Sequence, residues 1–208
     1  SKSERIGDVF YLVNAQYIEV DGHPFVLELV SRTDAALQAG DTLDKHPLFQ
    51  KAYLDAVTDV YGRRFLEERL DGVSIQAAAM LDADNFKYIN DSCGHTICDV
   101  ALRRIARVIR THLGANALVI RYGGDEFVIL FPETTPEQFQ QTLEKIREDI
   151  SRTPIEAGSP HLLSVSIGGV YGVPNLTDAI RQADQLMYLA KQQKNQVQYR
   201  IIMGGREK

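Results

Sequence analysis

The sequence predicts an α/β sandwich in which helices flank a mixed or antiparallel sheet. β-rich runs and amphipathic helical runs are mixed along residues 55–203, and one clear hairpin, RYGGDEFVIL at 121–130, lies in the middle. Ahead of them, residues 9–32 read as two strands around the dipeptide Asp21-Gly22, which is a strong hairpin signal. These observations predict a main α/β domain preceded by a β-hairpin.

The front of the chain is too small to form a domain by itself. Two strands alone are marginally stable, so this hairpin must pack on something else. The polar stretch that follows contains helix breakers, and we expect a connector that ends in a helix from about Pro47 to Val57. We therefore divide the chain into a front segment, residues 1–46, and a main domain, residues 47–208.

Hydrophobic periodicity and turn signals divide the main domain into helices and strands. The expected helices cover residues 63–70, 86–92, 96–113, 135–151 and 175–194. The expected strands cover residues 73–84, 117–123, 126–132, 161–173 and 197–203. The helix at 96–113 places Val100, Ile105 and Ile109 on or near one face, which predicts that this face packs on the sheet.

The composition excludes several classes of function. The net charge of −5 argues against a general nucleic-acid binder, which needs a basic face. Two cysteines, Cys93 and Cys98, are too few for a disulfide framework or a zinc site, so we expect reduced thiols in a cytoplasmic protein. No apolar run approaches transmembrane length and no signal peptide leads the chain, although the sequence leaves open whether the full protein is tethered to a membrane.

Acidic side chains follow two of the expected strands. Asp82 and Asp84 lie at the carboxyl end of one strand, and the hairpin tip carries Asp125 and Glu126. If these strands are neighbours, three or four carboxylates converge at one rim, where a cation must offset their repulsion. Oxygen-only ligands suit Mg²⁺ or Mn²⁺, and Mg²⁺ keeps positions open for phosphate oxygens. The pattern indicates phosphoryl or nucleotidyl transfer with two metal ions.

The glycine pair Gly123-Gly124 has two readings. Without side chains, this backbone can approach a phosphate closely and donate N–H groups to it. The alternative is a plain hairpin turn whose acids point into water.

The stretch after the first acids adds further candidates. We expect Asp84 to cap a helix that starts at Asn85. Lys87, one turn from the acids, can neutralise developing phosphate charge, or it is simply a solvated surface charge. Asn90 and Asp99 offer an amide and a carboxylate of the kind that pair with a guanine edge. The alternative for Asn90 is a helix C-cap.

Four stretches of the chain resemble a known family. The run GGDEF stands at residues 123–127, and DADNFKYINDSCGHTICD, DAVTDVYGRRF and ADQLMYLAKQQKNQV accompany it. In their order along the chain they resemble the motifs of the GGDEF-domain diguanylate cyclase family from residue 55 to about residue 200. The resemblance implies a fold similar to the polymerase palm and to the catalytic core of nucleotidyl cyclases.

The resemblance also implies an activity and partners. Such domains condense two GTP molecules into cyclic di-GMP, with two Mg²⁺ or Mn²⁺ ions per site. One domain holds one GTP, so the resemblance implies a homodimer that an upstream sensor regulates. The front segment, residues 1–46, weakly resembles the last strands of a PAS sensor domain and its linker; the alternative is an unrelated hairpin from a larger input domain.

The motif positions imply roles for individual residues. Metal would be bound by Asp82, the Ala83 carbonyl, Asp125 and Glu126, with Asp125 also the base for the 3′-hydroxyl and Lys87 stabilising the transition state. Substrate would be bound by Asn90, His95, Asp99, Gly123 and Gly124, and the triphosphate by Lys191. From its position alone, His95 reads as a helix-entry residue bonded to backbone.

The chain departs from the family pattern at several positions. Cys98 replaces a glycine, and Lys194 stands near the place of a phosphate-binding arginine. The inhibitory product motif R-x-x-D reads GANA at residues 114–117, so we expect no product inhibition through that site. Three functions remain open: an active diguanylate cyclase, a degenerate domain that binds GTP or cyclic di-GMP to regulate a partner, and a cyclase that makes another cyclic nucleotide.

Overall fold

The computed structural model describes residues 2–6, 9–20, 23–32, 47–70, 72–156, 161–203 and 206–207, with side chains for 50–70, 72–156 and 161–203. The chain divides into two compact units, Ser1–His46 and Pro47–Lys208, and each is described by itself. Among the described residues, no helix is both long and apolar enough to cross a bilayer.

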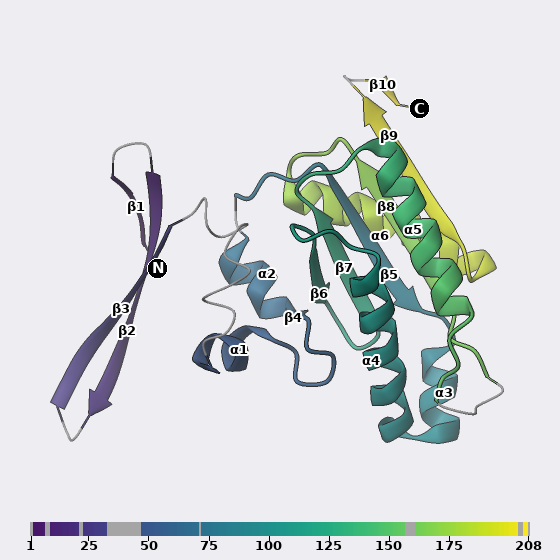
Figure 1. Ribbon diagram of the computed structural model, residues 1–208, viewed down its shortest axis with the longest axis horizontal. Helices are drawn as coiled ribbons and strands as arrows, with labels where there is room; N and C mark the ends of the chain where they lie inside the picture. The colour runs from purple at the N-terminus through teal and green to yellow at the C-terminus, as the bar shows by residue number, and fades with distance from the viewer. Residues whose placement is uncertain are drawn as a thin grey trace. The chain divides into compact units, whose positions relative to one another are not determined.

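The first unit is a three-stranded antiparallel sheet, drawn in purple in Figure 1, with the order β1-β2-β3. β1 is Lys2–Ile6, β2 is Val9–Val20 and β3 is His23–Arg32. The β2–β3 pairing confirms the expected hairpin. β1 was not expected, because its sequence KSERI is mostly polar and carries little strand signal. The expected turn Asp21-Gly22 and the connector at 33–46 lie outside the described residues.

The second unit contains six helices among the described residues. They are α1 Pro47–Tyr53, α2 Arg63–Arg69, α3 Phe86–Cys93, α4 His95–Thr111, α5 Pro136–Ser151 and α6 Leu176–Gln193. Its strands are β4 Tyr61–Gly62, β5 Ala77–Ala83, β6 Leu118–Arg121, β7 Glu126–Phe131, β8 Val165–Tyr171, β9 Val197–Met203 and β10 Arg206–Glu207. The strands form one sheet in the order β10-β9-β8-β5-β7-β6-β4. Two pairs, β8–β9 and β4–β6, are parallel and the others antiparallel, which confirms the expected mixed sheet flanked by helices.

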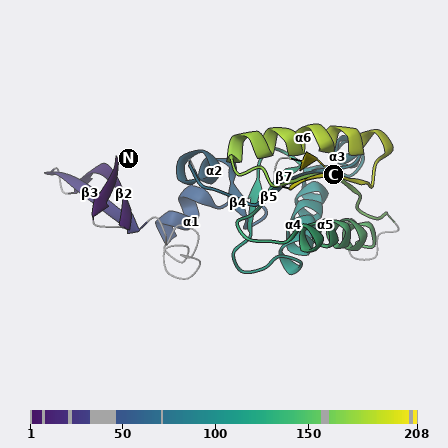
Figure 2. The same cartoon turned by 90° about the horizontal axis from the view of Figure 1, so that it is seen from above.

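The sheet is covered on both faces. Figure 2 shows α6 on one side and α4 and α5 on the other. The β5 residues Ala77, Ala79 and Leu81 face the core that contains α4 and α5, while Ala78 and Met80 face the core that contains α2 and α6. Because both faces of β5 are buried, its sequence is continuously apolar up to Leu81.

A close approach between α6 and β8 positions α6 over the sheet. A Cβ at Gly168 would overlap the backbone nitrogen of Met187 and the carbonyl oxygen of Ala183. Only glycine leaves room for this helix backbone, so Gly168 sets the height of α6 above β8.

Several boundaries differ from those expected. α1 ends at Tyr53 rather than Val57, because the side chain of Asp55 accepts the Val57 and Thr58 N–H groups in a turn. On α4, Ile105 and Ile109 lie in the core as expected, but Val100 is only partly buried at the margin of that face. The two-residue strands β4 and β10 were not expected, since such short runs carry no periodicity.

Candidate active site

The two acidic segments meet at one edge of the sheet. β5 lies between β7 and β8, and Asp82 is paired with Glu126 on one side and with Ser166 on the other. The Ala83 N–H donates to the Asp125 carbonyl oxygen over 3.2 Å, so the backbones of the two segments are in direct contact. The antiparallel register therefore places the end of β5 beside the hairpin tip.

Asp82 is a buried acid with an incomplete set of partners. Its residue surface is 3% exposed, and its Oδ2 lies 2.6 Å from Lys191 Nζ on α6. Its Oδ1 is buried with no hydrogen-bond partner among the described residues. Burial, together with the charges of Asp125 and Glu126, raises the pKa of Asp82 to about 6, although Lys191 opposes this rise. A buried carboxylate oxygen without a partner is costly unless a ligand completes it.

The donor set fits a divalent cation, although the carboxylates are not gathered around a single point. Among the described residues, no group of three or more His, Cys, Asp or Glu side chains lies close enough to hold a metal ion. Asp82 contacts Lys191 instead, and this ion pair, with the negative charges nearby, also raises the pKa of Lys191 against the effect of burial. Asp82 Oδ1 has no hydrogen-bond partner among the described residues, and the charges of Asp125 and Glu126 are near enough to raise the pKa of Asp82. Together the three carboxylates offer oxygen ligands of the kind that Mg²⁺ binds.

The glycines of the hairpin differ in what surrounds them. A Cβ at Gly123 would lie 2.6 Å from Glu126 Oε2, whereas a Cβ at Gly124 would meet nothing within 4 Å. Neither glycine has a positive φ, so the turn does not require them for backbone conformation. The Gly124 position therefore leaves open space at the tip, beside Asp125.

An arginine that the sequence reading did not single out holds this hairpin. Arg121 donates through Nε and Nη2 to the Gly124 carbonyl oxygen, at 3.1 and 2.7 Å, and through Nη1 to both oxygens of Asp55, at 3.0 and 3.1 Å. Asp55 also accepts from the Thr58 N–H and hydroxyl. Asp55 begins the motif DAVTDVYGRRF, and Arg121 directly precedes YGGDEF. Their positions at these motifs were the only sequence signal for this contact.

Asp55 stays ionised in its ion pair with Arg121 at neutral pH. Burial alone would raise the pKa of Asp55, but hydrogen bonds from Thr58 and Arg121 outweigh it and lower the pKa below its ordinary value. Asp55 is therefore ionised throughout the neutral range and positions the hairpin through Arg121.

The expectation that Asp84 caps α3 is wrong. The N-cap position is occupied by Asn85, with φ of 58° and no side-chain capping bond. Asp84 is buried and accepts hydrogen bonds from the hydroxyls of Ser164 and Ser166 and from the Asn195 N–H. Ser164 directly precedes β8, Ser166 lies at its start, and Asn195 lies in the turn after α6. Because Asp84 accepts hydrogen bonds from these groups, its carboxylate links the end of β5 to β8 and to that turn instead of capping α3.

The remaining candidate residues lie on α3, α4 and the turn between them. Lys87 and His95 are exposed, while Asn90 and Asp99 are partly buried. The described contacts do not join these four side chains to the acids. Asn90 is not the C-cap, because α3 continues to Cys93 and is capped by Gly94.

Cys98 contacts one of these candidates. Its buried Sγ donates to Asn90 Oδ1 over 3.6 Å. Burial raises the pKa of the Cys98 thiol, and the charges of Asp99 and Asp125 add to the effect, so Cys98 stays protonated. The other thiol, Cys93, is exposed, and neither cysteine forms a disulfide.

Comparison with known proteins decides the family. The profile described as "Diguanylate cyclase, GGDEF domain" matches residues 52–197. The chain belongs to the GGDEF domain family.

Individual relatives carry different names. The chain is 32% identical over 158 residues to diguanylate cyclase DosC of Escherichia coli (strain K12), and this match covers 70% of the chain and 34% of DosC. It is 34% identical over 159 residues to cyclic di-GMP phosphodiesterase PdeB of Shewanella oneidensis, covering 73% of this chain and 19% of PdeB. The chain thus spans about a third or less of these relatives.

Solved structures share the fold. The crystal structure of diguanylate cyclase SiaD, in complex with its activator SiaC from Pseudomonas aeruginosa, matches with a TM-score of 0.67 and 27% identity. The match covers 73% of this chain and 63% of SiaD. The GGDEF fold predicted from the motifs is therefore confirmed.

The GGDEF domain departs from the expected pattern after α6. Lys194, the expected substitute for a phosphate-binding arginine, has φ of 56° and donates through Nζ to Asn85 Oδ1 over 2.7 Å. The next residue, Asn195, also has a positive φ, 49°, and its buried Oδ1 has no hydrogen-bond partner among the described residues. In this structure Lys194 therefore closes the turn onto the start of α3.

Proposed function

We propose that this GGDEF domain is a diguanylate cyclase, which condenses two GTP molecules into cyclic di-GMP and two pyrophosphates. The observation that carries the proposal is the Asp82 Oδ1, which is buried near the charges of Asp125 and Glu126 and has no hydrogen-bond partner among the described residues. A buried acid under like charges is unfavourable for the apo protein. It becomes favourable in a site that binds a divalent ion with a nucleotide triphosphate.

The proposed metal ligands lie at the edge of the sheet where β5 ends beside the hairpin tip. Asp82, Asp125, Glu126 and the Ala83 carbonyl oxygen would hold two Mg²⁺ or Mn²⁺ ions per site. When bound, such ions polarise the α-phosphate and favour ionisation of the attacking hydroxyl. Lys191, released from Asp82 by the positive charge of the ions, would then be free to bind the triphosphate.

The chain's own residues account for the rest of the reaction. Asp125 takes the proton of the 3′-hydroxyl as that oxygen forms a bond to the α-phosphorus of the partner GTP. The bond between this phosphorus and the bridging oxygen to the β-phosphate breaks, and pyrophosphate leaves with the electron pair. Lys87 stabilises the negative charge that develops, and the N–H groups of Gly123 and Gly124 approach the phosphates.

Substrate selection is assigned to α3, α4 and the turn between them. Asn90, His95 and Asp99 would bind the substrate, with the amide and the carboxylate facing the guanine edge. Each domain holds one GTP, so closure of the cyclic product requires a homodimer with two facing sites. We assign the protein to the cytoplasm, with regulation by an upstream sensor to which the partial PAS-like segment, residues 1–46, belongs.

A second function is favoured by one observation. Lys194 is engaged with Asn85, and no arginine follows it at the expected place in the late motif. A domain with a weakened triphosphate contact could bind GTP or cyclic di-GMP without turnover and regulate a partner. The intact acids favour the cyclase.

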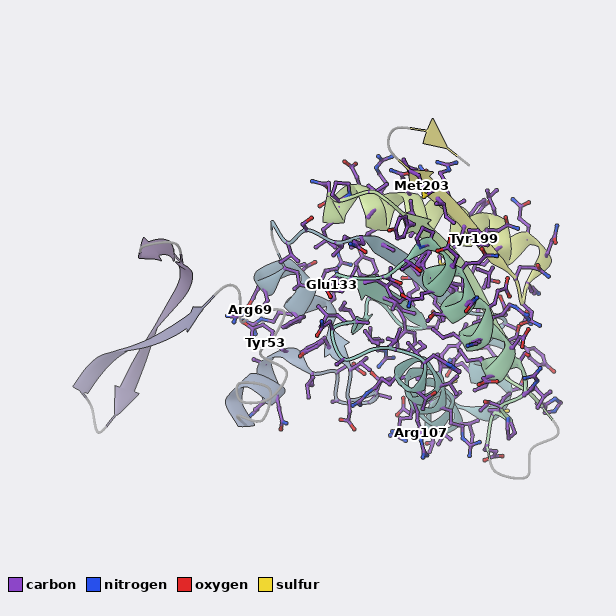
Figure 3. The ribbon with its side chains drawn as sticks, turned by 45° about the horizontal axis from the view of Figure 1, so that its top comes forward. Tyr53, Arg69, Arg107, Glu133, Tyr199 and Met203 are labelled. Carbon is purple, nitrogen blue, oxygen red and sulfur yellow. The ribbon has the colours of Figure 1, made fainter. Side chains whose placement is uncertain are left out.

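Incubation of the purified protein with GTP and Mg²⁺, followed by identification of products by mass, separates these functions. The cyclase yields cyclic di-GMP and pyrophosphate, a regulatory domain yields no product, and a different cyclase yields another cyclic nucleotide. Asp125→Ala should abolish turnover while the fold survives, as judged by thermal melting. Glu133→Ala serves as the control, because Glu133 is an exposed acid at the opposite end of β7 (Figure 3).

A further inference from the structure

A pocket lies away from the acidic edge, between α4 and the loop that precedes β4. It has a volume of about 440 Å³ and is lined by Thr58, Asp59, Arg103, Arg107, Arg110 and Thr111. None of these residues is one of the proposed metal or substrate ligands. Its size is in the range of pockets that bind small ligands.

The three arginines of this pocket lie on one face of α4. Their spacing is four and then three residues, which brings successive side chains above one another on a helix. All three are exposed, and Figure 3 shows Arg107 projecting from α4. We call this group the α4 arginine pocket.

The charge of the α4 arginine pocket is largely uncompensated. Arg103 donates through Nε to the Val57 carbonyl oxygen over 3.0 Å, which leaves its terminal nitrogens available. Among the described side chains, Arg107 and Arg110 have no ion-pair or hydrogen-bond partner. Elsewhere on the described helices and at the cap of α5, the arginines that pair with a carboxylate three or four residues away are Arg63, Arg64, Arg147, Arg152 and Arg181.

Two ordinary explanations do not account for the arrangement. Favourable interaction with the helix dipole explains a basic residue in the last turn, which applies to Arg110 but not to Arg103. Compensation by Asp59 also fails, because this acid lies within ion-pair distance of none of the three arginines. The pocket therefore carries three positive charges against one negative charge.

The chemistry of the pocket selects phosphate groups. Guanidinium groups bind phosphate oxygens through two parallel N–H donors and are well suited to anion recognition. Arg103 and Arg110 are separated by seven residues, which is about 10 Å along a helix axis. That separation exceeds a single phosphate and suits a ligand with two or more phosphate groups. We propose that the α4 arginine pocket binds a diphosphate or longer phosphate chain.

The pocket adjoins the loop that carries Asp55, whose ion pair with Arg121 holds the GGDEF hairpin. Its wall residues Thr58 and Asp59 belong to the loop in which Asp55 holds Arg121. A ligand bound there contacts the loop that positions the GGDEF hairpin. The site itself does not depend on the proposed cyclase activity.

Calorimetric titration of the protein with inorganic pyrophosphate in EDTA tests the proposal without metal-dependent binding at the acidic edge. Arg107→Ala with Arg110→Ala should weaken binding at least about tenfold. The matched control, Arg152→Ala with Arg181→Ala, removes two exposed arginines elsewhere and should change binding less than about twofold. Asp125→Ala should leave pyrophosphate binding intact, whether or not it abolishes turnover, which separates this proposal from the cyclase.

Further probes define the ligand. Orthophosphate should bind at least about tenfold more weakly than pyrophosphate, because it cannot span the arginines. Sedimentation with vesicles of phosphatidylglycerol and phosphatidylcholine tests for a lipid surface. Association with vesicles without pyrophosphate binding, no pyrophosphate binding at all, or equal binding by the Arg107/Arg110 double variant would overturn the proposal.

Discussion

Asp82, at the end of β5, combines three properties that are rarely found in one carboxylate. It is buried, one of its oxygens contacts Lys191, and the other has no hydrogen-bond partner in the part of the chain that the structure describes. Burial and the neighbouring acids raise its pKa to about 6, so the protonated form is favoured in the folded apo protein below that pH. The contribution of Asp82 to apo stability is therefore present at low pH and lost as the pH rises through about 6.

Metal binding should depend on pH in the opposite direction. A cation needs the ionised carboxylate, so Mg²⁺ affinity should rise from pH 5 to pH 7 and level off above it, with one proton released per site near pH 6. Titration of Mg²⁺ in a pH series measures this. Asp82→Asn should remove the dependence, and an affinity that is flat between pH 5 and 7 in the wild type would contradict the assignment.

Arg121 is the second residue on which the site depends. Arg121→Ala removes the donors that join Asp55 to the Gly124 carbonyl oxygen, and we expect the free energy of unfolding to fall by about 1–3 kcal/mol. Arg121→Lys should recover only part of this, because an ammonium group does not bridge both partners as the guanidinium does. Urea denaturation measures the change. Wild-type stability in the alanine variant would show that the contact does not hold the hairpin.

At the scale of elements, the glycines of β8 and of the hairpin provide a matched test. Gly168→Ala should destabilise the fold by at least about 3 kcal/mol, because the new Cβ would meet the backbone of α6, which cannot move locally. Gly124→Ala should stay within about 1 kcal/mol of the wild type, because its Cβ meets nothing. Thermal and urea unfolding measure both.

The same pair also tests the role of the hairpin. Gly124→Ala should weaken GTP binding despite its normal stability, because the new methyl group occupies the open space beside Asp125. Equal stability of the two variants would contradict the packing account, and normal GTP binding by Gly124→Ala would contradict the phosphate role.

The elements that the sequence predicted are those with long periodic patterns. α4, α5 and α6 and the apolar strand β5 were expected within a few residues, because burial on one or both faces dictates their residue types. The two-residue strands β4 and β10 are too short to leave a local pattern, and β4 also depends on pairing with the distant strand β6. Asp84 shows the same limit: its local sequence suits a helix cap, but Ser164, Ser166 and Asn195 come from segments far along the chain.

At the scale of the whole molecule, the site arises from segments more than forty residues apart. The motifs predicted metal-binding roles for Asp82, Asp125 and Glu126, and the antiparallel register of β5 with β7 brings Asp82 beside Glu126. Arg121 was missed because its role is visible only when Asp55 and the Gly124 carbonyl lie beside it. The Lys191–Asp82 contact likewise depends on how α6 crosses the sheet, which periodicity alone does not specify.

Regulation by product is a prediction for the assembled protein. Residues 114–117 read GANA in place of the arginine and aspartate of the family's inhibitory motif. We expect turnover to continue at concentrations of cyclic di-GMP that saturate such motifs. A chromatographic assay with added cyclic di-GMP measures this, and strong non-competitive inhibition would show that another surface carries the inhibitory role.

We infer that acids from β5 and from the hairpin bind divalent ions beside a triphosphate. Calorimetry with a GTP analogue that carries a methylene bridge between the α- and β-phosphates tests it without turnover. We expect EDTA to weaken binding to the wild type at least about tenfold. Asp82→Asn and Asp125→Asn should each lose this magnesium dependence, while Glu133→Gln should retain it. Binding by the two site variants with the same magnesium dependence as the wild type would contradict the account.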